Sequence, residues 1–314
     1  MSQPLSVYRR RRAVALGVIA GVFLLAFLAL RSCGGEAAQR ASEPEAEAAA
    51  PAVAQLPRGG RRIFPDFRVV AFYGAPQDEQ LGALGIGTPT AAGRRLRRVA
   101  RGYSKKTRPV LPAFELITTI AAAAPGDDGL YRMHQSDAVI TRYLRAARKV
   151  KALLLLDIQP GRGDFLSEVR RLERWLQEPD VGIALDPEWH VKPAEVPGRV
   201  IGSVTADEVN AAAQYVSSFV VDHDLPEKLF VVHQFTSGMI VDKERVAKHP
   251  GLAVTMNVDG FGDRANKLSK YAQFTTELAR FHDGFKLFYE EDTNLMSPGA
   301  VLDMRPPPDL VVYE

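Results

Sequence analysis

Short apolar runs, each bounded by turn residues, recur along the chain from Ile63 onward. Near-continuous apolar runs of this length are typical of parallel strands that are buried on both faces. The runs that predict strands are Phe67–Tyr73, Pro109–Glu115, Ala152–Gln159, Val181–Asp186, Val200–Val204, Leu229–Phe235, Leu252–Val258 and Phe285–Tyr289. A later apolar run, Leu310–Tyr313, has no assigned role in this pattern.

Helical periodicity fills most of the intervals between these runs. The predicted helices are Ser136–Val150, Phe165–Glu178, Ala206–Val221 and Asp263–His282. Thr205 and Glu208 have the spacing of a capping box at the start of the third helix. Strands that alternate with helices over about 250 residues predict an α/β fold, a (β/α)8 TIM-type barrel. Because Pro187–Arg199 leaves no room for a full helix, an open doubly wound sheet is the alternative.

The first 62 residues differ in composition from the rest. The uncharged run Ala13–Leu30 directly follows Arg9–Arg12 and, at 18 residues, is long enough to span a bilayer as a helix. Arginines on the N-terminal side of an apolar span favour a cytoplasmic location for the N-terminus. We therefore expect a cytoplasmic basic tail at 1–12, a transmembrane signal-anchor at 13–31, a disordered linker at 32–62 and the barrel at 63–314. This topology predicts a single-pass protein of the cell membrane whose domain lies on the extracytoplasmic side.

Two other interpretations of the N-terminal segment remain open. Leu30-Arg31-Ser32-Cys33 resembles a bacterial lipobox, which implies a lipid anchor on Cys33. A cleaved signal peptide is the third interpretation, although the apolar stretch of such peptides is shorter, about 7–15 residues. All three place the domain outside the membrane. With Cys33 as the only cysteine, an intramolecular disulfide and a cysteine-based zinc site are excluded.

The net charge of +3 comes from the N-terminal segment. Residues 1–62 hold nine arginines and four glutamates, whereas residues 63–314 hold 31 basic and 33 acidic side chains. The predicted domain is therefore slightly acidic. This distribution gives no support to a nucleic-acid partner.

Acidic, aromatic and amide side chains gather at the C-terminal ends of the predicted strands, where barrel enzymes place their sites. The residues expected to line a substrate site are Tyr73, Glu115, Asp157, Gln159, Trp189, His233, Gln234, Asp259 and Tyr289. Asp186 and Glu188 are the predicted catalytic pair, because residues i and i+2 of a strand face the same side. Burial and a charged neighbour would raise one pKa, giving a proton donor beside an anion, as glycosidic bond cleavage requires.

The segment around this pair resembles known families. Chitinase-type glycoside hydrolases carry D-G-x-D-x-D-x-E on the fourth barrel strand, and Val181–Glu188 matches its glycine, last aspartate and glutamate. Val181 and Ala184 stand in place of the first two aspartates. Barrel-type muramidases carry a similar LD-x-E. The resemblance implies that Glu188 is the general acid and Asp186 the neighbouring stabiliser.

The whole domain also resembles uncharacterised exported actinobacterial proteins, through PAFE (112–115), DIQPGR (157–162), LDPEW (185–189) and PDLVVY (308–313). That resemblance implies a location and a fold but no reaction.

The expected function is a membrane-tethered glycoside hydrolase that acts on a cell-wall or extracellular glycan. The alternative is a non-catalytic barrel that binds an envelope glycan or a protein, and the two missing aspartates favour it. In that alternative, Asp186 and Glu188 would cap a loop or pair with Arg162 or Arg199. If the barrel is instead a hydrolase, Asp259 is the alternative nucleophile. Because the histidines form no H-x-H or H-E-x-x-H pattern, the sequence predicts no metal, and no other cofactor is expected.

Overall fold

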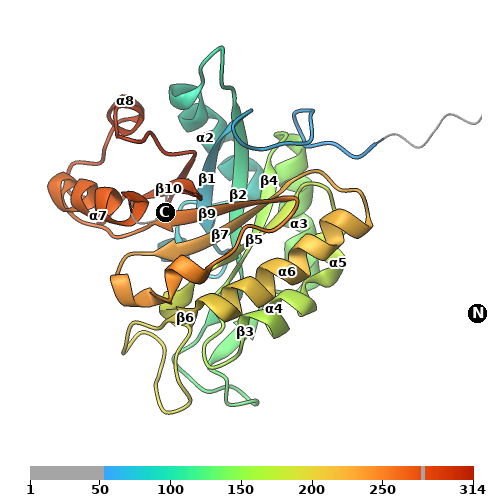
Figure 1. The fold of residues 1–314 in the computed structure, drawn as a ribbon, viewed down its shortest axis with the longest axis vertical. Coiled ribbons are helices and arrows are strands. Elements are labelled where there is room, and N and C mark those ends of the chain that lie inside the picture. The colour runs from blue at the N-terminus through green and yellow to red at the C-terminus, as the bar shows by residue number, and fades with distance from the viewer. Residues whose placement is uncertain (1–52, 277–279) are drawn as a thin grey trace, which may run out of the picture. The chain divides into compact units, whose positions relative to one another are not determined.

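The computed structural model describes residues 53–276 and 280–314 (Figure 1). The expected basic tail, the signal-anchor, Cys33 and most of the linker lie outside these residues and stay predictions. Among the helices that are described, none has the length and apolar character needed to cross a membrane.

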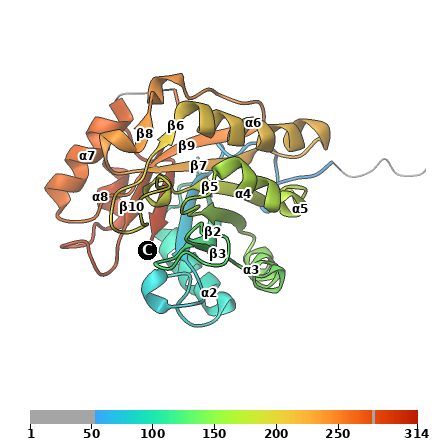
Figure 2. The ribbon, with the colours of Figure 1, turned by 90° about the horizontal axis from the view of Figure 1, so that it is seen from below.

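Eight parallel strands close into a barrel, so the predicted (β/α)8 architecture is confirmed. The ring closes because β1 pairs with β2 on one side and with β11 on the other. Figure 2 shows the helices arranged around the strands. In chain order the barrel strands are β1 (Arg68–Gly74), β2 (Val110–Ala121), β4 (Leu153–Ile158), β5 (Val181–Leu185), β7 (Lys228–Gln234), β9 (Leu252–Val258), β10 (His282–Leu287) and β11 (Leu310–Tyr313).

One predicted barrel strand is wrong, and the unassigned apolar run takes its place. Val200 and Ile201 are 40% and 57% exposed, and only Val204–Thr205 (β6) is extended, in a two-stranded pairing with β8 (Ile240–Val241) outside the barrel. The eighth barrel strand is instead β11, which lies between β1 and β10. All four of its side chains are buried, as required of a strand covered on both faces.

The structure has helices at all four predicted positions, and α2 (Pro89–Ala100) and α8 (Pro298–Leu302) in addition. Those at the predicted positions are α3 (Asp137–Lys149), α4 (Phe165–Arg171), α5 (Glu173–Leu176), α6 (Ala206–Asp222) and α7 (Arg264–Thr276). The capping box of Thr205 and Glu208 is formed in full at the start of α6. The helix expected at Phe165–Glu178 is broken at Leu172 into α4 and α5. A short antiparallel strand, β3 (Arg132–His134), extends the sheet beside β2.

Alternate residues of each barrel strand face the interior or the helices. On β1, Val69 and Ala71 belong to the interior cluster, whereas Val70 and Phe72 pack with the helix-facing side chains. Leu56, which falls within the expected linker, is also buried in the interior cluster. The interior below the C-terminal end of the barrel is therefore mostly apolar.

Candidate active site

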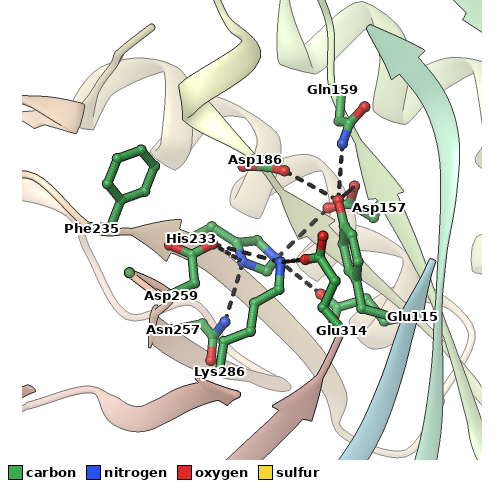
Figure 3. Close-up of polar contacts among 12 residues, drawn as sticks. Glu115, Asp157, Gln159, Asp186, His233, Phe235, Asn257, Asp259, Lys286 and Glu314 are labelled. Carbon is green, nitrogen blue, oxygen red and sulfur yellow. Dashed lines mark hydrogen bonds and ion pairs between the residues drawn. The ribbon is translucent and has the colours of Figure 1, made fainter. Parts of the chain in front are cut away.

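A polar side chain occupies an inward-facing position at or just after the C-terminal part of every barrel strand. We call these residues the polar ring: Tyr73, Glu115, Asp157, Asp186, His233, Asn257, Lys286 and Glu314. Side chains two residues apart on a strand point to the same face, which explains why the polar ring faces inward. Each of its members lies two residues beyond a small or apolar interior position such as Ala71 or Val231. Figure 3 shows how the members contact one another.

His233 is held between two carboxylates at the centre of the ring (Figure 3). Its Nδ1 lies 2.9 Å from Asp259 Oδ2 and its Nε2 lies 3.0 Å from Glu115 Oε1. Burial opposes a charged imidazolium, but the hydrogen bonds to Asp259 and Glu115 outweigh it and raise the pKa of His233. Burial also opposes ionisation of Asp259, yet its bond to His233 lowers the pKa of that carboxyl. The pair is therefore ionic.

Tyr73 connects two further carboxyl groups of the ring. Its hydroxyl lies 3.4 Å from Asp157 Oδ2 and 3.3 Å from Asp186 Oδ2, and it accepts a hydrogen bond from Gln159 Nε2 at 2.9 Å. One hydroxyl proton serves only one of these acceptors at a time. Burial, followed by repulsion from Asp186, raises the pKa of Asp157, while burial and then Glu188 raise that of Asp186. Protonated carboxyl groups are thus favoured here.

Lys286 is the cation of the ring that sequence reasoning missed. Its Nζ lies 2.6 Å from Glu314 Oε2, 3.9 Å from Asp259 Oδ2 and 3.7 Å from the centroid of the Tyr73 ring. Burial favours the neutral amine, but Glu314 outweighs it and raises the pKa of Lys286, so this side chain stays an ammonium ion. A lysine within the apolar run Phe285–Phe288 is the signal that could have identified it.

A pocket of about 340 Å³ opens at this end of the barrel. Its volume falls within the range of small-molecule sites, roughly 300–1,000 Å³. The aromatic part of its wall consists of Tyr73, Trp189, Phe235, Phe261 and Phe288, and the charged part of Glu188, Asp259, Lys270, Lys286, Glu291 and Glu314. The pocket therefore combines apolar walls with a charged floor.

Only Glu188 of the predicted catalytic pair lines the pocket, although burial and then the charge of Glu188 raise the pKa of Asp186. The strand ends at Leu185, and Pro187–Trp189 forms a 3-10 turn, so the i, i+2 rule no longer applies. Asp186 is buried against Tyr73, whereas Glu188 is only partly buried and lies in the pocket wall. Burial and then the charge of Asp259 raise the pKa of Glu188 to about 7.

The other predicted site residues divide into three groups. Tyr73, Gln159, Trp189 and Asp259 line the pocket. Glu115, Asp157 and His233 are buried, and are not among the residues that line it. Gln234 is also buried, with its amide donating to Thr236 O, and Tyr289 is 44% exposed and stacks on Tyr313.

Three buried side chains are also spaced to hold a metal ion. The ligand atoms of Glu115, Asp157 and His233 lie within 4.8 Å of one another, in a site that the histidine spacing in the sequence does not indicate.

Comparison with known proteins gives no family for the chain. No protein-family model matches it, and neither does any curated protein. Among solved structures, the wild-type sialic acid aldolase of Ruminococcus gnavus is 14% identical, with 79% of this chain and 68% of that one covered and a TM-score of 0.37. The catalytic lysine mutant of the same aldolase is 13% identical, with 79% and 67% covered and a TM-score of 0.38.

The expectation of a glycoside hydrolase that acts on a glycan is not supported by these matches, which are sialic acid aldolases. The predicted pair also does not line the pocket as a pair, because Glu188 lies in its wall and Asp186 does not. At such low identity the likeness concerns the fold and assigns no reaction to this chain.

Proposed function

We propose that the chain is an enzyme that transfers a proton on a small carbonyl compound, with Glu188 as the acid–base group and Lys286 as the cation facing the carbonyl oxygen. The observation that carries the proposal is the Glu188 carboxyl in the pocket wall, with a pKa of about 7. A general acid or base is most effective when its pKa lies near the working pH, since both protonation states are then populated.

The charges of the pocket suit an enolate-type intermediate. Ionised Glu188 removes a proton from the carbon next to the carbonyl group, and the C–H electron pair forms a C=C bond as the carbonyl oxygen becomes an anion. The ammonium group of Lys286 stabilises that anion at the pocket floor. Since Glu314 keeps Lys286 protonated, the lysine acts as a cation and does not attack the carbonyl carbon as an amine.

The pocket wall indicates the kind of substrate. Trp189, Phe235, Phe261 and Phe288 form apolar surface above the charged floor. A molecule with an apolar or ring body and an oxygen-bearing head group fits this division, because a pocket of this type orients its ligand through a few polar groups. Proton return to a different carbon makes the reaction an isomerisation, and loss of a leaving group makes it a lyase reaction.

The test is exchange of the acidic C–H in D2O, followed by proton NMR over a panel of 2-oxo acids, ketoses and hydroxyketones. We expect exchange with a subset of the panel, increasing as the pH rises through about 7. Glu188→Gln should lower the rate by roughly 100-fold or more, the usual contribution of a general base. The control Glu244→Gln changes an exposed glutamate and should leave the rate unchanged. Absence of exchange across the panel, or equal rates in Glu188→Gln and wild type, would refute the proposal.

We also propose, from the sequence alone, that residues 13–31 anchor the protein in the membrane with the barrel on the extracytoplasmic side. The length of the uncharged run and the four arginines before it support this topology. Digestion of intact cells by an added protease should degrade the barrel of the full-length protein. Protection of the barrel until the cells are lysed would contradict it. The carbohydrate partner expected from the sequence stays a prediction.

A further inference from the structure

Three side chains of the polar ring converge on one buried point. Glu115 Oε1 lies 3.0 Å and Asp157 Oδ1 3.8 Å from Nε2 of His233, and all three side chains are completely buried. Two ligands of a tetrahedral zinc ion, each about 2.1 Å from the metal, lie roughly 3.4 Å apart. The two observed separations fall on either side of this value. Small side-chain movements would therefore allow all three atoms to bind one metal ion.

Two neighbouring side chains, Asp259 and Tyr73, each orient one of these three groups. Asp259 accepts from Nδ1 of His233 at 2.9 Å, which fixes the imidazole so that Nε2 faces Glu115 and Asp157. Metal-binding histidines are usually oriented in this way by a carboxylate on the other ring nitrogen. Asp157 is held through its other oxygen, Oδ2, by the hydroxyl of Tyr73.

Unpartnered oxygens give an independent indication of a bound cation. Asp157 Oδ1, directed at the point between the three groups, is buried and has no hydrogen-bond partner, and the same holds for Glu115 Oε2. Buried polar atoms are normally satisfied, because leaving one unpaired costs roughly 1–3 kcal/mol. The nearby ammonium group of Lys286 does not meet this need, since it pairs with Glu314.

We propose that Glu115, Asp157 and His233 bind a divalent transition-metal ion, such as Zn2+ or Mn2+, beneath the floor of the pocket. Imidazole favours transition metals and carboxylates also accept Mn2+, so this ligand set fits either ion better than it fits Ca2+. Binding places the metal on Nε2 and releases the proton from that nitrogen to solvent. Three protein ligands leave coordination positions open.

The experiment uses the full-length protein, stripped of metal with a chelator and dialysed. ZnCl2 or MnCl2 is titrated in by calorimetry, and the bound metal is counted by mass spectrometry. We expect one ion per chain and a rise in melting temperature with metal. Asp157→Asn, which keeps the shape and removes the charge, should abolish both effects, and Asp259→Asn should weaken binding by roughly 10–100-fold, as for other partners of a metal-binding histidine.

Asp186→Asn is the matched control. Asp186 is equally buried and contacts the same Tyr73 hydroxyl, but it is not one of the three ligands, so the variant should still bind one ion. If Asp157→Asn does not fold, as judged by circular dichroism, Glu115→Gln replaces it. The proposal is overturned if stripped wild type takes up neither metal, or if the ligand variants bind as wild type does. Because Glu188→Gln should bind metal normally, failure here is distinguishable from failure of the proposed enzyme reaction.

Discussion

Replacing Glu188 with glutamine should change the pH dependence of stability in a defined direction. Burial and Asp259 raise the pKa of this carboxyl from 4.5 in the unfolded chain to about 7 in the fold. Between these values the folded state holds a proton that the unfolded state has lost, so wild-type stability falls as the pH rises. Glutamine does not titrate, so the stability of Glu188→Gln should not fall for this reason as the pH rises.

The size of the effect follows from the same shift. At pH 8 the raised pKa of Glu188 lowers the free energy of unfolding by about 3 kcal/mol. At pH 5 it lowers this free energy by about 1 kcal/mol, because the carboxyl is still protonated in the fold but already largely ionised in the unfolded chain. Relative to wild type, Glu188→Gln should therefore gain about 2 kcal/mol in free energy of unfolding between pH 5 and pH 8. The sign is opposite to that of an ion-paired carboxylate, for which stability is lost on acidification.

Urea denaturation of both proteins at pH 5, 6, 7 and 8 measures this difference, provided that the slopes with urea agree. Glu244→Gln, which changes an exposed glutamate, should show no comparable trend. A difference between Glu188→Gln and wild type that stays constant from pH 5 to pH 8 would refute the raised pKa, and with it the support for Glu188 as a base near neutral pH.

Three further predictions concern the barrel and its ring. Lys286→Met removes the cation 2.6 Å from Glu314 and should lower the free energy of unfolding at pH 7 by roughly 3–5 kcal/mol, whereas the double variant with Glu314→Gln should recover part of this in urea denaturation. Thr205→Ala removes the capping box of α6 and should cost about 1 kcal/mol by the same assay; no loss would show that the cap is not stabilising. Deletion of residues 309–314 removes β11 and opens the ring between β1 and β10, so circular dichroism should show no cooperative thermal transition; a wild-type transition would contradict the role of β11 in closing the barrel.

The barrel was predictable because burial on both faces leaves a strong local signal. Seven of the eight barrel strands coincide with apolar runs that the sequence identifies, although β2 continues to Ala121, beyond the predicted end at Glu115. The misassigned strand shows the limit of this signal. Val200–Val204 and Leu310–Tyr313 are both short apolar runs, and only pairing with β1 and β10 distinguishes the second as a barrel strand.

The site was predictable only in part. Listing polar residues at strand ends found Tyr73, Glu115, Asp157 and His233, because the period of two directs them inward. The predicted i, i+2 placement of Asp186 and Glu188 on one strand face was not found, since a proline after the strand starts a 3-10 turn and only Glu188 lines the pocket.

By itself, the sequence determined which strands are buried and that their C-terminal ends carry acids. Only the tertiary structure decided which of these acids meet a cation. Lys286 and Glu314 come from β10 and the residue after β11, and they form an ion pair with each other because β10 and β11 pair in the sheet. The pKa of Glu188 is likewise raised by burial and then by Asp259, 71 positions away in the sequence. Electrostatic interactions depend on distance in space and on burial, and neither is recorded in the local pattern of a strand.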